Sequence, residues 1–237
     1  MKVMSQLNQI IQQLTLRRLL LQLKKLAGAN IDEVTDMSWE DIKKVADDSG
    51  NKLHQGQIFT GRLELTVFFQ EWEDAASLLL EAGDLRPALR GMVTMPRYTF
   101  CEGLISIHAA QVTTTPWIQK RKWKKRALKS AKLIRGMVKR GNVNLVHCLH
   151  LLEAELAVLD GKNEKAEANY KSAIDAATTN GFVQDRALSH ELASAYFAKK
   201  GDEYWRDYHM EQCQNSYLDW GAYSKVEALR NAIETNV

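Results

Sequence analysis

The sequence predicts an all-α fold, a right-handed α-solenoid of about five or six antiparallel helix hairpins. Three observations support this class. Apolar residues recur at helical spacing through the second half of the chain. Glycine-centred breaks divide that half into segments of about 16 to 20 residues. All three prolines lie between residues 87 and 116, so the flanking regions contain no strong helix breaker.

The N-terminal region predicts helices of irregular arrangement. Residues 3–27 read as one helix, and 28–37 as a loop. Ser38, with Asp41 three residues later, resembles a capping box that opens a short helix. We expect residues 1–52 to form an irregular cap on the solenoid.

The repeat domain is expected to cover residues 53–237. It opens with a predicted hairpin, in which 53–70 pairs with 72–82. A helix follows from Pro96 to Ala110, and 111–115 reads as a loop. Thr115 and Pro116 then predict a cap with proline at the first position of the next helix.

Four glycine junctions mark the later helix boundaries. A glycine stops one helix, and a polar residue beside it is expected to cap the next. The junctions are Gly141-Asn142, Gly161 followed by Asn163, Asn180-Gly181 and Gly201-Asp202. Because a helix of this length is stable in water mainly through packing of an apolar stripe, the pairs must stack on one another.

Small residues at fixed offsets indicate how closely the hairpins pack. In "LDGKNEKAEANYKSAI" (159–174), Gly161 is followed by Ala166, Tyr170 and Ala173, which resembles the turn and second helix of a tetratricopeptide repeat. We expect the alanines to let two helices approach and the tyrosine to fill the adjoining space. The same offsets in "FFQEWEDAASLLLEAG" place Ala75, Leu79 and Ala82 in these roles.

A basic segment is the most prominent candidate for binding. Residues 119–140 hold eleven Lys or Arg and no acid, although the net charge of the whole chain is only +3. One apolar stripe beginning at Trp123 should pack inward, and the other faces stay basic. The candidate partner-binding residues are Lys120, Arg121, Lys122, Trp123, Lys124, Lys125, Arg126 and Lys129. A solvated outer helix, an acidic protein segment and a nucleic acid are the three readings of this charge.

No pattern of residues predicts catalysis, a cofactor or a metal. His147 and His150 flank Cys148, and His209 lies four residues before Cys213, but two ligands do not make a zinc site. Glu153 and Glu155 face different directions on a helix, so a solvated rim is expected. An enzyme with an unrecognised site near His147, His150 and Glu153 remains an alternative.

The last 95 or so residues resemble the helical-repeat region of large multidomain signalling ATPases. The resemblance lies in "NGFVQDRALSHELASAYF" and "YLDWGAYSKVEAL", and extends in register, more weakly, to about residue 55. In that family the repeats join a kinase-like domain and an AAA-type ATPase to GAF, histidine-kinase or cyclase domains. The resemblance implies a relay or scaffold segment and transfers no catalytic residue.

Together these observations predict a non-catalytic scaffold for protein interaction or intramolecular coupling. The expected partners are acidic or amphipathic helical segments, including other domains of a parent protein. An adaptor for nucleic acid or an anionic surface is the alternative. Three widely spaced cysteines and the lack of a long apolar run predict a cytoplasmic protein without a membrane span.

Overall fold

All regular structure that the computed structural model describes is helical. The model describes residues 16–28 and 38–234. The helices are residues 16–27, α2 (Trp39–Asp48), α3 (Lys52–Phe68), α4 (Trp72–Ala82), α5 (Thr94–Gln111), α6 (Trp117–Lys139), the 3-10 turn η1 (Val143–Leu145), α7 (Val146–Leu159), α8 (Asn163–Thr179), α9 (Val183–Lys200), α10 (Glu203–Trp220) and α11 (Tyr223–Glu234). The predicted all-α class is confirmed.

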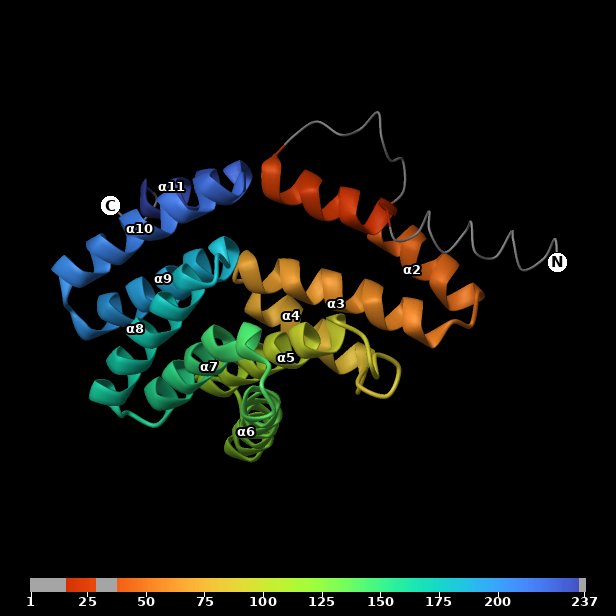
Figure 1. Cartoon of the computed structure of the whole chain (residues 1–237), viewed down its shortest axis with the longest axis horizontal. Coiled ribbons are helices and arrows are strands. Elements are labelled where there is room, and N and C mark those ends of the chain that lie inside the picture. The colour runs from red at the N-terminus through yellow and green to blue at the C-terminus, as the bar shows by residue number, and fades with distance from the viewer. Residues whose placement is uncertain (1–15, 29–37, 235–237) are drawn as a thin grey trace.

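Helices that follow one another in the sequence pack against one another. The closest pairs are α5 with α6, α7 with α8, and α9 with α10, while α3, α5, α7 and α9 also contact in succession. In Figure 1 the chain follows an arc from α2–α4 through α5–α7 to α8–α11. Across this arc Phe68 in α3 packs on Trp220 in α10, with ring centroids 4.9 Å apart.

The four glycine junctions are confirmed as turns between helices. Their glycines all have positive φ, which residues with a side chain adopt at a cost; the values are 95° at Gly141, 70° at Gly161, 73° at Gly181 and 78° at Gly201. The predicted caps are mostly wrong. Only Asp202 accepts a hydrogen bond from the helix that follows it, from the backbone N–H of Trp205, and Asn163 is the first residue of α8 rather than its cap.

The first half agrees with the prediction except near Pro116. Ser38 and Asp41 form the predicted reciprocal capping box of α2, and α3 packs against α4 as expected. Helix α6 begins one residue after Pro116, and no side chain caps it. Residues 3–15 of the predicted first helix and 29–37 of the predicted loop lie outside the described residues.

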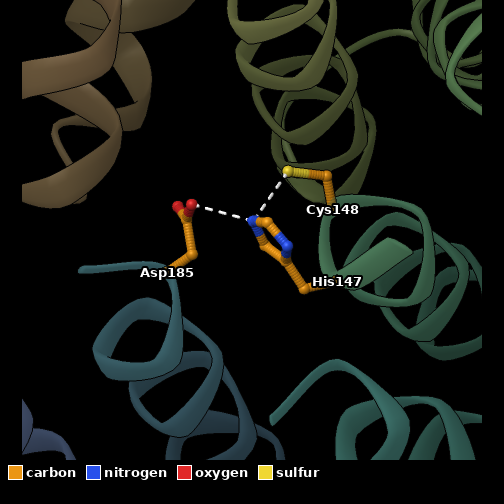
Figure 2. A group of neighbouring side chains, drawn as sticks. All are labelled: His147, Cys148 and Asp185. Carbon is orange, nitrogen blue, oxygen red and sulfur yellow. Dashed lines mark hydrogen bonds and ion pairs between the residues drawn. The ribbon is translucent and has the colours of Figure 1, made fainter. Parts of the chain in front are cut away.

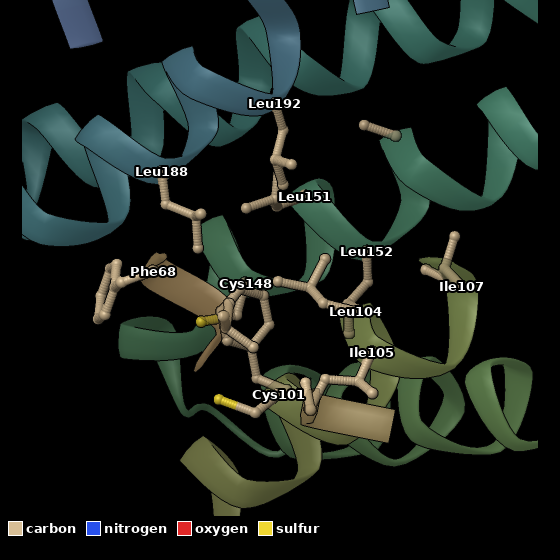
Figure 3. Close-up of a cluster of buried hydrophobic side chains, with 14 of the residues drawn as sticks. Phe68, Cys101, Leu104, Ile105, Ile107, Cys148, Leu151, Leu152, Leu188 and Leu192 are labelled. Carbon is tan, nitrogen blue, oxygen red and sulfur yellow. The ribbon is translucent and has the colours of Figure 1, made fainter. Parts of the chain in front are cut away.

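The core lies between α3, α5, α7 and α9. Figure 3 shows buried side chains from these helices meeting, among them Leu104, Leu152 and Leu188. At Gly103 a Cβ atom would stand 2.6 Å from Cδ2 of Leu152. The glycine therefore permits the close approach of α5 and α7.

The residues assigned to hairpin packing lie as follows. Ala166, Tyr170 and Ala173 are buried on one face of α8, and the Tyr170 hydroxyl donates a hydrogen bond to Glu155 of α7. Ala75 and Leu79 are buried in α4, whereas Ala82 is half-buried against the core. Gly161 occupies the turn between α7 and α8.

Replacing Ala166 with leucine tests whether its small size sets the spacing of α8. The side chain is fully buried, so the added carbons should clash and lower the free energy of unfolding by about 1–3 kcal/mol. Ala168→Leu is the matched control, because Ala168 is exposed on the same helix; its effect should stay within about 0.5 kcal/mol. Equal effects of the two changes in denaturant titrations would contradict this packing.

Candidate functional site

The outward face of α6 carries a row of exposed cations. This basic stripe is defined by the exposed residues Arg121, Lys122, Lys125, Lys129, Lys132 and Lys139. None of them forms an ion pair with any residue that the structure describes. At a rise of 1.5 Å per residue, the row from Arg121 to Lys139 extends for roughly 27 Å along the helix.

The other predicted binding residues of α6 face its neighbours. Trp123 is buried in the core, so it does not belong to the surface for which it was a candidate. Lys124 pairs with Asp160 at 2.6 Å. Lys120 is half-buried, and its Nζ lies 3.4 Å from the carbonyl oxygen of Thr113.

Glu102 in α5 anchors the inner side of α6. Its fully buried carboxylate accepts hydrogen bonds from Arg126 Nε at 2.8 Å and from Ser130 Oγ at 2.7 Å, both in α6. Arg86 supplies a second cation at 2.9 Å. Since a buried carboxylate is costly unless it is paired, this contact fixes which face of α6 points outward.

Large apolar side chains are exposed along the same helix. Trp117, Ile118 and Leu128 are 69%, 54% and 50% exposed. At 100° per residue, Ile118 falls within the arc that carries the basic stripe, and Trp117 and Leu128 fall within about 40° of its edge. The outward face of α6 therefore combines positive charge with apolar contact area.

A second constellation lies inside the molecule, where α7 meets α9. His147 and Cys148 are in the first turn of α7, and Asp185 is in the first turn of α9. Figure 2 shows the three side chains pointing toward one another. Nε2 of His147 lies 2.9 Å from Oδ2 of Asp185 and 3.3 Å from Sγ of Cys148, and all three residues are buried.

Arg97 of α5 binds Oδ1 of Asp185, the carboxylate oxygen that does not face His147. Its Nη1 donates to Oδ1 of Asp185 at 2.6 Å, and its Nε donates to Glu64 of α3 at 2.7 Å. Burial acts to raise the pKa of Asp185, but the guanidinium of Arg97 and the hydrogen bond from His147 outweigh it and hold the pKa below its usual value.

The arrangement does not form a Cys-His-Asp relay. Burial raises the pKa of the Cys148 thiol well above its ordinary value, so the thiol is protonated near neutral pH. In a relay, the acid would orient one ring nitrogen while the other faces the nucleophile. Here Asp185 and Cys148 approach the same nitrogen, and Nδ1 of His147 has no hydrogen-bond partner among the described residues.

These side chains line a cavity of about 420 Å³. Its wall also includes Asn142, Asn144, Phe182 and Gln184. The ring of Phe182 stacks on His147, with centroids 4.4 Å apart. The imidazole is thereby fixed between an aromatic face and a carboxylate.

Of the residues considered from the sequence as an enzyme site, His150 and Glu153 lie 4.0 Å apart, from Nδ1 to Oε2, whereas His147 is directed toward Asp185 of α9. His150 lies near Asn169 of α8, at 3.4 Å, and Glu153 pairs with Arg135 of α6. Glu155 is buried instead of lying on a solvated rim, because its carboxylate accepts the hydrogen bond from Tyr170. No local pattern in the sequence pointed to Asp185, which lies 38 residues from His147.

An aromatic groove crosses the surface between α8, α9 and α10. Phe197, Trp205 and Tyr208 line it, and the last two are partly exposed. At its base, Nδ1 of His190 lies 2.9 Å from Nδ1 of His209. Burial, together with the charges of His209 and Arg186, lowers the pKa of His190 to about 3, and burial also lowers the pKa of His209.

The pH dependence of the free energy of unfolding should report the protonation of His190. The unfolded chain takes up a proton at His190 near pH 6.5, whereas the folded chain does not until about pH 3. Stability is therefore full above pH 6.5 and falls as the pH is lowered. From pH 7.5 to 5, the wild type should lose about 2 kcal/mol more than His190→Gln. Urea unfolding across this range measures the difference; parallel curves would contradict the assignment.

Comparison with known proteins returned no match: no family model, no curated protein and no solved structure resembles this chain closely enough to be matched. Within residues 16–28 and 38–234, no helix combines the length and the apolar character that crossing a bilayer requires.

Proposed function

We propose that this chain is a non-catalytic segment for protein interaction or intramolecular coupling, and that the basic stripe of α6 docks an acidic amphipathic helix. The observation that carries the proposal is the row of six cations without ion pairs, on a helix whose inner face is fixed by Glu102. A fixed helix presents its charges in one geometry, which favours electrostatic recognition.

The chemistry of the stripe favours a protein partner over a nucleic acid. Ile118 places apolar surface among the cations, Trp117 and Leu128 place it beside them, and a helix with acidic and apolar side chains complements both. A phosphate backbone would match the charge alone. Readout of bases in addition needs a stacking platform or a groove-reading element, and Trp117 is the sole aromatic residue that α6 exposes.

In this proposal the helices form a right-handed, tetratricopeptide-like stack, part of a multidomain signal-transduction ATPase or kinase. The contacts between successive hairpins and the buried small residues at Ala166 and Ala173 support such a stack. The resemblance of residues 143–229 to the repeats of those ATPases supports the assignment to such a parent protein. Solenoids suit coupling because each repeat contacts only its neighbours and leaves a long continuous surface.

The proposal predicts that binding depends on the stripe and not on net charge. The probe is a fluorescent synthetic helix with glutamates on one face and leucines on the other. Lys122→Glu, Lys125→Glu and Lys132→Glu together should weaken its binding on the order of tenfold or more. The control, Lys44→Glu, Lys165→Glu and Lys171→Glu, changes net charge equally at exposed positions outside α6 and should have little effect.

Fluorescence anisotropy at low and moderate salt measures both variants. Equal weakening by the two sets of changes, or no weakening by either, would contradict docking on α6. A labelled DNA duplex is tested in parallel. If the duplex binds more tightly than the acidic helix and loses affinity through the stripe changes, the nucleic-acid adaptor replaces this proposal.

A further inference from the structure

Three metal-ligating atoms already face one another between α7 and α9. Nε2 of His147, Sγ of Cys148 and a carboxylate oxygen of Asp185 all lie within 4.8 Å of one another. Around a tetrahedral zinc ion, nitrogen, sulfur and oxygen ligands stand roughly 3.4–3.6 Å apart. The observed separations of 2.9 Å and 3.3 Å from Nε2 would thus each need to widen by only a fraction of an ångström.

The charges around the cluster fit a divalent cation. The guanidinium of Arg97 pairs with both Glu64, at 2.7 Å, and Asp185, at 2.6 Å, so one cation faces two carboxylates and one negative charge is left over. A thiolate at Cys148 would add a second negative charge. One divalent ion neutralises both, and Arg97 then serves as the outer partner that orients the ligating carboxylate.

We infer that His147, Cys148 and Asp185 bind one zinc ion or a similar divalent transition metal, with a fourth position open to the adjoining cavity. Imidazole, thiolate and carboxylate are the ligands that zinc takes in proteins. On binding, the thiol releases its proton to solvent, and the imidazole proton moves from Nε2 to Nδ1. That atom is buried without a partner in the described part of the chain, so it is free to carry the proton.

Cobalt titration of the full chain, first stripped of metal with a chelator, tests the inference. Co²⁺ accepts the same ligands and reports a bound thiolate by a charge-transfer absorption band. The wild type should take up one equivalent with this band, and Zn²⁺ should displace it. Cys148→Ser should abolish the band and weaken zinc binding at least about 100-fold, the upper end of what loss of an outer partner costs.

The controls separate loss of a ligand from loss of fold. Cys213→Ala removes a cysteine that lies outside the cluster and should leave the band unchanged. Asp185→Asn should keep the thiolate band but weaken binding, and circular dichroism checks that each variant is folded. The inference is overturned if the folded wild type takes up no cobalt, if its spectrum lacks a thiolate band, or if Cys213→Ala abolishes that band.

Discussion

Buried carboxylates, each paired with groups from other helices, fix how the helices of this chain stack. Arg97 of α5 reaches Glu64 of α3 and Asp185 of α9, and Asp185 accepts a hydrogen bond from His147 of α7. Four helices that alternate along the sequence thus share one ionic cluster. A buried charge that loses its partner is strongly destabilising, so these contacts specify one relative position of the helices where apolar packing would allow several.

The same principle connects the core to the proposed binding surface. Glu102 accepts hydrogen bonds from Arg126 and Ser130 on the inner face of α6, and Asp160 forms an ion pair with Lys124. The six cations of the basic stripe have no ion pair with any residue that the structure describes. At Asp185 the outer oxygen is held by Arg97, which turns the other oxygen toward the proposed metal.

Local features of the fold could be predicted from the sequence, and long-range partners could not. Glycines 141, 161, 181 and 201 end helices because positive φ is easy only for glycine, and this signal is contained within a few residues. The burial of Glu155 and the contact of His147 with Asp185 depend on how different helices pack against one another. The local pattern predicts a solvated Glu155 because it cannot show that the hydroxyl of Tyr170, on the next helix, donates a hydrogen bond to it.

A double-mutant cycle at Arg97 and Asp185 measures the central interaction most directly. The free energy of unfolding is determined for the metal-free wild type, Arg97→Met, Asp185→Asn and the double variant. Each single change should cost about 3 kcal/mol or more, because it leaves a buried group unpaired. The double variant should cost less than the sum by about 2 kcal/mol. Strictly additive costs, or single costs below about 0.5 kcal/mol, would contradict a stack fixed by this ion pair.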